Sequence, residues 1–212
     1  ALAAKPSPNS HPVPRLNSAR GTRNSTTTTQ LGCFYNRACN RRPLSLALHA
    51  EVDVDTTDFT ALAMSCAPFV HASTAHALVA VESAFNPHAI GVVGGALERQ
   101  PRNRAEALAT AKRLTTNGWN FSVGLAQINL RNFERLGLNA DTAFDPCQNL
   151  RAMQTVLGEC LAPRAAKAEQ VALREALSCY YSGNAVTGFR HGYVQRVVRA
   201  VPTLRVSSGV PP

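Results

Sequence analysis

Residues 77–87 read Ala-Leu-Val-Ala-Val-Glu-Ser-Ala-Phe-Asn-Pro, and this stretch is the basis of our prediction of a helical fold. Leu78, Val81 and Phe85 recur at the spacing of one helix face, and the final Asn-Pro pair ends the predicted helix. Glu82 lies within that apolar face. A carboxyl group there is costly unless it is paired, hydrogen-bonded or protonated, and desolvation favours the neutral form that a general acid needs. Taken alone, the pattern also fits a Glu at the edge of the face whose head group reaches water.

Apolar periodicity and helix-end signals predict a mainly α domain around this stretch. Helices are predicted over about residues 57–68, 74–85, 103–118, 130–136, 146–161, 167–181 and 192–200. The glycine-rich residues 91–95 predict a loop or a short β-ribbon, and residues 119–125 a short extended piece. We therefore assign residues 51–205 to one domain of about 150 residues, which is large enough to bury a core, and residues 206–212 to a C-terminal tail.

Composition and charge limit what the rest of the chain can be. The chain has 212 residues, 45% of them apolar, and a formal net charge of +9. Residues 1–50 contain seven basic and no acidic side chains, and they are rich in Pro, Ser and Thr. We interpret them as a disordered basic leader or a processed segment; a nucleic-acid-binding arm is a less favoured alternative. No run approaches the roughly 18 apolar residues of a membrane span, so the sequence does not predict an integral membrane protein.

Four cysteines fall within the predicted domain, at positions 66, 147, 160 and 179, and none belongs to a Cys-x-x-Cys pair. Two disulfides in an oxidising compartment would account for them, although reduced core cysteines would give the same pattern. Cys147 and Cys160 lie on one predicted helix, about 20 Å apart, whereas a disulfide needs Cα atoms within about 7 Å. We therefore predict that Cys66 pairs with one of these two cysteines and Cys179 with the other.

Four short motifs follow one another along the predicted domain. They are Glu82-Ser83, Gly124-Leu125-Ala126-Gln127, Asp145-Pro146-Cys147-Gln148-Asn149-Leu150 and Cys179-Tyr180-Tyr181-Ser182-Gly183-Asn184. In this order they resemble the motifs of soluble lytic transglycosylases, the lysozyme-like enzymes that cleave peptidoglycan. The loop at 90–95, the run at 118–125 and the last motif more specifically resemble the lytic transglycosylase of type IV secretion systems. The resemblance covers about residues 57–200.

The resemblance implies a lysozyme-like single domain that cleaves the β-1,4 bond between N-acetylmuramic acid and N-acetylglucosamine. Glu82 would protonate the glycosidic oxygen and then take the proton of the muramoyl C6 hydroxyl, which gives a 1,6-anhydro product. Most glycosidases need two carboxylates, but no second acid has a comparable setting in this sequence. Glu98 and Glu106 lie in a basic, polar stretch, and Asp145 is a predicted helix cap. A single acid/base that works with an intramolecular nucleophile would not need a second carboxylate.

The family motifs also imply which residues bind the substrate. The candidates are Ser83, Gln127, Asn129, Tyr180, Tyr181 and Asn184. Tyr180 also continues an apolar helical stripe, so a plain core role is the alternative for it. The sequence departs from the family pattern at two positions, because Ala126 stands where Met is usual and Tyr181 where Asn is usual. The second departure puts any role of that amide in doubt.

The resemblance further implies partners and a location. Glycan strands of peptidoglycan and other components of a type IV secretion system would be the partners, in the periplasm, where the enzyme would open the cell wall locally. We expect no cofactor and no metal, since His71 and His76 have no carboxylate nearby and suit capping or surface roles. Two alternatives remain open: a non-catalytic peptidoglycan-binding or assembly module, and a hydrolytic lysozyme.

Overall fold

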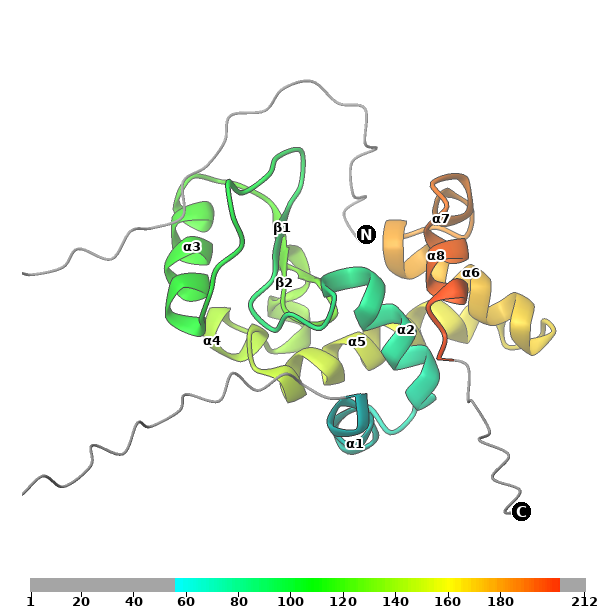
Figure 1. Ribbon diagram of the computed structural model, residues 1–212. Coiled ribbons are helices and arrows are strands. Elements are labelled where there is room, and N and C mark those ends of the chain that lie inside the picture. Colours follow the sequence, from blue (N-terminus) through cyan, green and yellow to red (C-terminus); the bar gives the residue numbers. More distant parts are fainter. Residues whose placement is uncertain (1–55, 203–212) are drawn as a thin grey trace, which may run out of the picture. The chain divides into compact units, whose positions relative to one another are not determined.

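The computed structural model describes residues 56–202, which are mainly helical with one small sheet (Figure 1). The α-helices are α1 (Thr56–Cys66), α2 (Ala72–Ser83), α3 (Arg104–Thr116), α4 (Ala140–Ala143), α5 (Pro146–Leu161), α6 (Glu169–Ser182), α7 (Thr187–Arg190) and α8 (Tyr193–Arg199). Short 3₁₀ turns cover η1 (Leu130–Asn132), η2 (Glu134–Leu136) and η3 (Ala162–Arg164). The predicted mainly α fold is confirmed. The predicted leader (1–50) and tail (206–212) lie outside the described residues, as do both ends of the predicted 51–205 domain.

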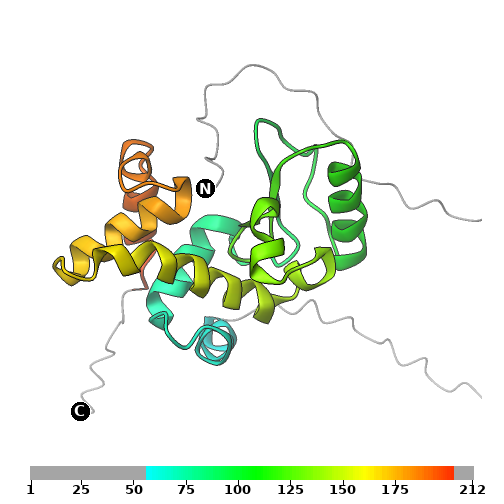
Figure 2. The ribbon, with the colours of Figure 1, turned by 180° about the vertical axis from the view of Figure 1, so that it is seen from behind.

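The last helices of the described chain lie beside one of the first. α8 packs against α2 and α6, and α5 packs against α1, α4 and α6. Figures 1 and 2 show α3 on one side of the strands and α6–α8 on the other side, with α2 and α5 between the strands and α6–α8. Within residues 56–202, no helix combines the length and the apolar character that crossing a bilayer demands.

The small sheet follows α2 in the sequence, as predicted. Its strands β1 (Ile90–Val92), β2 (Phe121–Val123) and β3 (Ile128–Asn129) are antiparallel and lie in the order β1-β2-β3. Ile90 faces Val123 and Val92 faces Phe121 across the first pair of strands. All four side chains are buried, so the sheet contributes directly to the core.

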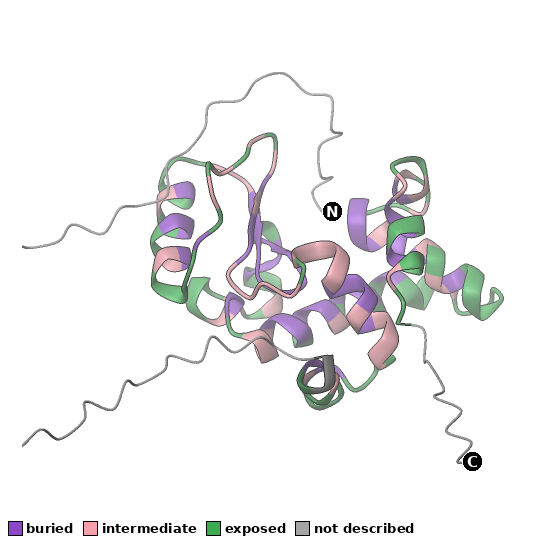
Figure 3. Cartoon of the chain, viewed as in Figure 1, coloured by how far each residue is buried: buried purple, intermediate pink, exposed green. Residues whose placement is uncertain are grey.

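Helix α5 is the central helix of the core, and local sequence signals determine where it begins. Asp145 caps it by accepting a hydrogen bond of 2.9 Å from the backbone N–H of Gln148, and Pro146 occupies the first turn. Figure 3 shows buried residues along α5, α2 and the strands. The buried residues of α5 are Asn149, Leu150, Ala152, Met153, Val156, Leu157 and Cys160. The predicted helix at 146–161 is confirmed.

Two disulfides join the helices, in agreement with the predicted exclusion of a Cys147–Cys160 pair. Cys66 and Cys147 form the α1–α5 bridge, with their Cα atoms 5.2 Å apart. Cys160 and Cys179 form the α5–α6 bridge, with a Cα separation of 5.7 Å. The sequence left two pairings open, and the packing of α1 against the beginning of α5 selects between them.

Helix α2 begins and ends earlier than predicted. His71 caps its N-terminus, because the imidazole Nδ1 accepts from the backbone N–H of Ser73. Histidine is outside the set of common N-cap residues, so the sequence placed the beginning of the helix too late. After Ser83, Ala84 (φ 50°) and Phe85 (φ 63°) adopt left-handed backbone angles that end the helix before the predicted Phe85.

Other predicted elements differ in detail from the structure. The predicted helix at 130–136 is two successive 3₁₀ turns, and the helix predicted from residue 167 begins at Glu169. The single-turn helices α4 and α7 were not predicted, because four residues are too few to show a helical period.

Only one half of a capping box forms at the beginning of α3. Asn103 accepts from the backbone N–H of Glu106 at 2.9 Å. The Glu106 carboxylate instead binds the Arg99 guanidinium and the backbone N–H of Arg102, and these bonds lower the pKa of Glu106 to about 2.

Candidate active site

Glu82 lies at the end of the buried stripe of α2. Ala75, Leu78 and Val79 are fully buried and precede Glu82 by seven, four and three residues, so all four share one side of the helix. The members of the stripe differ from those predicted, since Val81 and Phe85 are only partly buried. Glu82 itself is half-buried. The predicted placement of the carboxyl group at an apolar face is therefore correct, although Glu82 lies where that face meets a cleft.

The cleft beside Glu82 has a volume of about 520 Å³ and lies between α2 and β1. Its lining combines the last turn of α2, the backbone of β1 and a few polar side chains. The polar side chains that line it are Glu82, Ser83, Asn86, Gln100, Ser122 and Gln127. Of the described residues that line this cleft, Glu82 alone carries a carboxyl group. The sequence did not predict the contributions of Gln100 and Ser122.

Tyr193 forms a hydrogen bond with the carboxyl group of Glu82. Its hydroxyl donates a hydrogen bond of 2.7 Å to Oε1 of Glu82, and the side chain is almost fully buried. Burial, followed by the charge and hydrogen bond of Glu82, raises the pKa of Tyr193 well above its ordinary value. The phenol therefore stays protonated and remains a donor throughout the neutral range.

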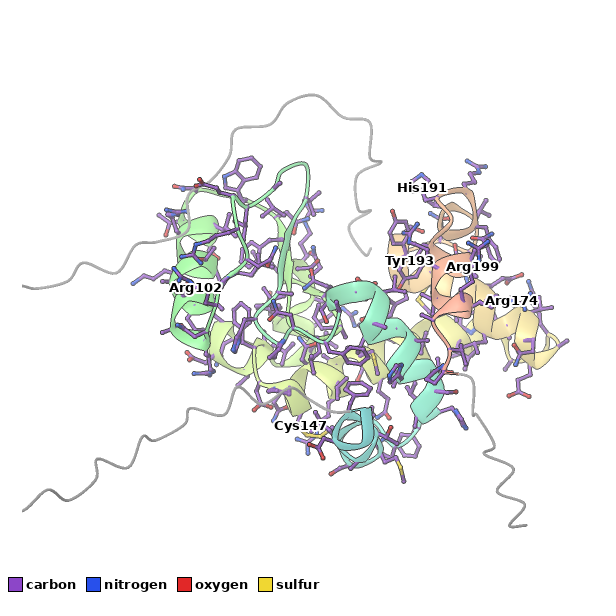
Figure 4. The ribbon with its side chains drawn as sticks, viewed as in Figure 1. Arg102, Cys147, Arg174, His191, Tyr193 and Arg199 are labelled. Carbon is purple, nitrogen blue, oxygen red and sulfur yellow. A yellow bond between two sulfur atoms is a disulfide. The ribbon has the colours of Figure 1, made fainter. Side chains whose placement is uncertain are left out.

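Sequence reasoning missed Tyr193, which is separated from Glu82 by 111 residues. The residue begins α8, and nothing in the local pattern distinguishes it from a core tyrosine. The packing of α8 against α2 brings the two side chains together. Figure 4 shows Tyr193 on the C-terminal helices, close to His191.

Tyr181, one of the candidate substrate-binding residues, packs against Tyr193. The two rings stack with centroids 4.6 Å apart and planes inclined by 20°. The Tyr181 hydroxyl also lies 3.2 Å from Nδ1 of His191. The Tyr181 ring is therefore packed behind the partner of Glu82.

The turn at residues 124–127 is fastened to α5 by Asn149, which is fully buried. The Asn149 amide donates to the carbonyl groups of Val123 (3.0 Å) and Ala143 (2.8 Å), and its oxygen accepts from the backbone N–H of Ala126 (2.8 Å). Gly124 has a φ of 78°, and a Cβ atom there would lie 2.3 Å from the Asn149 amide nitrogen. Glycine is therefore required by both the backbone conformation and the close approach.

Tyr180 lies behind the same turn. Its hydroxyl donates to the carbonyl oxygen of Ala126 at 2.7 Å. Burial, and then the charge of Glu82, raise the pKa of Tyr180 well above its ordinary value. The side chain is thus a core residue, as the alternative for it predicted, and it lies close enough to Glu82 for the carboxylate charge to affect its pKa.

Gln127 presents its side chain to the cleft from a left-handed backbone position (φ 50°). Its Nε2 donates to the carbonyl groups of Ala89 (3.1 Å) and Gly124 (3.0 Å), so both amide hydrogens are used by the scaffold. Its Oε1 lies against Gly91, where a Cβ atom would approach it to 2.7 Å. The carbonyl end of Gln127 is therefore the end that faces the β1 side of the cleft.

The remaining predicted site residues are engaged in different ways. Ser83 lines the cleft, and its hydroxyl donates to the carbonyl of Val79 at 3.3 Å. Asn129 is buried, and its amide nitrogen donates to the Ser122 hydroxyl at 3.2 Å. Asn184 is exposed, and its side-chain oxygen accepts from two backbone N–H groups at the start of α7. Asn129 and Asn184 thus fix backbone turns around the site.

The two histidines considered in the sequence, His71 and His76, cap a helix and pack against aromatic rings, respectively. His71 caps α2, and His76 packs between the rings of Phe59 and Phe85, with centroid distances of 5.8 and 4.7 Å. Burial lowers the pKa of His76, which favours its neutral form. Among residues 56–202, no group of three or more His, Cys, Asp or Glu side chains could hold a metal ion.

Known proteins resemble this chain along most of the described residues. The chain is 49% identical over 148 residues to the type IV secretion system protein virB1 of Brucella suis biovar 1 (strain 1330), a match covering 66% of this chain and 62% of that protein. It is 37% identical over 172 residues to protein virB1 of Agrobacterium fabrum (strain C58 / ATCC 33970), covering 76% and 69%. Protein virB1 of Rhizobium radiobacter is 36% identical over 154 residues, covering 71% and 64%. The chain thus spans less than two thirds of the length of the Brucella protein, and no solved structure matches it.

The family comparison covers the candidate site completely. The model of the transglycosylase SLT domain matches residues 60–196, which run from α1 into α8. This segment contains Glu82, the lining of the cleft and Tyr193. Because the match extends over more than half of the 212 residues, the chain belongs to the transglycosylase SLT domain family.

Proposed function

We propose that this protein is a lytic transglycosylase that cleaves the β-1,4 bond between N-acetylmuramic acid and N-acetylglucosamine in peptidoglycan. The observation that carries the proposal is the placement of Glu82, half-buried at the edge of a cleft and held by Tyr193. A partly desolvated carboxyl group suits general acid catalysis. Membership of the transglycosylase SLT domain family supports the same chemistry.

The proposed reaction uses Glu82 twice. Protonated Glu82 donates its proton to the glycosidic oxygen as the bond from that oxygen to C1 of the muramoyl sugar breaks. The resulting carboxylate then accepts the proton of the muramoyl C6 hydroxyl, whose oxygen forms a new bond to C1. The products are a 1,6-anhydromuramoyl end and a free 4-hydroxyl group, and Glu82 is protonated again.

This mechanism agrees with the number of carboxyl groups that line the cleft. Retaining and inverting glycosidases place two carboxyl groups across the scissile bond, but Glu82 is the one carboxyl group among the described residues lining this cleft. An intramolecular hydroxyl nucleophile removes the need for a second protein carboxylate. The Tyr193 hydrogen bond stabilises the carboxylate that exists between the two proton transfers.

The other predicted site residues receive roles in binding and positioning. We assign the Gln127 carbonyl and the Ser83 hydroxyl to contacts with the sugars, because both residues line the cleft. Tyr180, Asn129 and Asn184 position the turns around it through their bonds to the backbone and to Ser122. Tyr181 positions Tyr193 by stacking.

We further propose that the protein acts in the periplasm and opens the cell wall locally for a type IV secretion apparatus, whose other components would be its partners. The virB1 names of its relatives support this assignment. The two disulfides support an oxidising compartment, because such bonds are rare in the cytosol.

Digestion of purified sacculi tests the proposal, with the products identified by mass spectrometry. We expect anhydromuropeptides from the intact protein and none from Glu82→Gln. The matched control is Glu98→Gln, which makes the same substitution at an exposed position and should retain full activity. Reducing muramoyl ends would instead identify a hydrolytic lysozyme. Binding to sacculi without turnover, unchanged in Glu82→Gln, would identify a non-catalytic binding or assembly module.

A further inference from the structure

The end of the described chain carries an unusual distribution of charge. Residues 176–202 contain three arginines and one histidine but no acidic side chain. Arg190, His191, Arg196 and Arg199 lie on α7, α8 and the link between them, and all four are exposed. We refer to these four residues as the basic corner. Within residues 56–202, no salt bridge involves any of them.

One member of the basic corner, Arg196, contacts Tyr193, which is the hydrogen-bond partner of Glu82. The Arg196 guanidinium lies over the Tyr193 ring, 6.0 Å from its centroid, and donates a hydrogen bond of 3.1 Å to the carbonyl of His191. The His191 ring in turn contacts the Tyr181 hydroxyl. Figure 4 labels His191, in the link between α7 and α8, together with Tyr193 and Arg199 of α8. Tyr193 thus contacts both Arg196 and Glu82.

We infer that the basic corner binds the carboxylates of the peptide stems carried by the glycan strand. The inference rests on the proposed function, because a muramoyl sugar seated at Glu82 carries its peptide on the lactyl group close to the scissile bond. Peptidoglycan stems are acidic, and their α- and side-chain carboxylates are exposed. Arginine is suited to such groups, since its planar guanidinium can donate two parallel hydrogen bonds to one carboxylate.

The location of the corner favours stem carboxylates over a polyanion such as nucleic acid or a lipid surface. A polyanion would need a broad basic face, whereas residues 51–212 as a whole are nearly balanced, with 15 basic and 13 acidic side chains. The basic corner is instead a local group on α7, α8 and the link between them, and its Arg196 lies over the ring of Tyr193, the partner of Glu82. Local cations beside a cleft also increase the rate at which an anionic substrate is captured.

Binding measurements in the full-length Glu82→Gln background test the inference without turnover. The two probes are soluble peptidoglycan oligomers with intact stems and the same oligomers with their carboxyl groups converted to amides. For Arg190→Gln and Arg196→Gln we expect affinity for the intact oligomer to fall about two- to fivefold each. Affinity for the amidated oligomer should be unchanged, and Arg196→Lys should recover part of the loss. The matched control is Arg151→Gln, which removes an exposed arginine from α5.

Each outcome of this experiment separates the inference from the proposed function. Equal losses on both probes, or no loss in the Arg190→Gln/Arg196→Gln double variant, would refute the role of stem carboxylates alone. A parent protein that binds neither oligomer would refute the proposed function, and the inference with it. Duplex DNA and phosphatidylglycerol vesicles are added as further probes. If the arginine substitutions weaken only these, the corner binds a polyanion and the inference is wrong.

Discussion

Asn149 gives a sharp test of how the scaffold positions the candidate site. The residue is fully buried and joins α5 to the turn at 124–127 by three hydrogen bonds of 2.8–3.0 Å. Asn149→Leu keeps a similar side-chain volume but removes all three bonds. The backbone N–H of Ala126 and the carbonyl groups of Val123 and Ala143 then lose these partners inside the core.

The expected loss of stability follows from these groups. Each hydrogen bond contributes about 1 kcal/mol net, and a buried polar group left without a partner costs about 1–3 kcal/mol. We therefore expect Asn149→Leu to lower the free energy of unfolding by about 3–5 kcal/mol. For a chain of this size, about 2–4 °C of melting temperature is lost per kcal/mol, so the melting temperature should fall by roughly 6–20 °C.

Urea unfolding measures this loss, and sacculus digestion at a temperature where the variant is still folded measures the effect on the site. Gln127 belongs to the turn that Asn149 holds, and a shift of about 1 Å near the chemistry can cost about 100-fold in rate. Gln170→Leu removes an amide from an exposed site on α6 and serves as the control. A stability loss below about 1 kcal/mol, or full activity in the folded variant, would refute the reasoning.

Three further predictions concern other parts of the structure. Tyr193→Phe should lower the free energy of unfolding by about 0.5–1.5 kcal/mol, because it removes the hydrogen bond to Glu82. Additivity with Glu82→Gln in a urea double-mutant cycle would contradict this. Replacing the cysteines of the α1–α5 bridge should lower the free energy of unfolding by about 4.5 kcal/mol, because this disulfide closes a loop of 81 residues. The α5–α6 bridge closes a loop of 19 residues, so its loss should cost about 3.2 kcal/mol. The reverse order of these two losses in urea unfolding would contradict the loop-entropy argument. The Arg99 guanidinium and a backbone N–H lower the pKa of Glu106 from 4.5 to about 2, so the contribution of Glu106 to stability is present above pH 4.5 and is lost as the pH falls toward 2. The free energies of unfolding of Glu106→Gln and of the parent should therefore converge at low pH. A difference that stays constant with pH would contradict this prediction.

The sequence predicted best those elements whose signals are local. Helix α5 was placed correctly because Asp145 and Pro146 give a standard beginning and its buried residues recur with helical spacing. The beginning of α2 was misplaced because its cap is His71, which the usual capping rules do not include. Its end was misplaced because Ala84 and Phe85 adopt left-handed angles that neither residue type favours.

Contacts between distant parts of the chain were predicted less well. Helix geometry excluded one cysteine pairing, but the choice between the remaining two depends on how α1 packs against α5. Tyr193 was missed for the same reason, because its contact with Glu82 exists only after α8 has packed against α2. Periodicity identifies which face of a helix is buried, but it does not identify the residue that will meet that face.

The structure also separates two kinds of residue that the family motifs combine. The side-chain amides of Gln127, Asn129, Asn149 and Asn184 all bond to protein groups that fix turns around the cleft. These bonds give each amide a structural role in the backbone around the cleft, and for Gln127 this role stands beside the sugar contact that we propose for its carbonyl oxygen. Glu82 differs from them, because it ends a buried stripe at the cleft and meets a donor whose phenol remains protonated. The motifs therefore describe mainly a scaffold that holds one carboxyl group in position, and this agrees with the proposed mechanism of a single acid/base working with a nucleophile from the substrate.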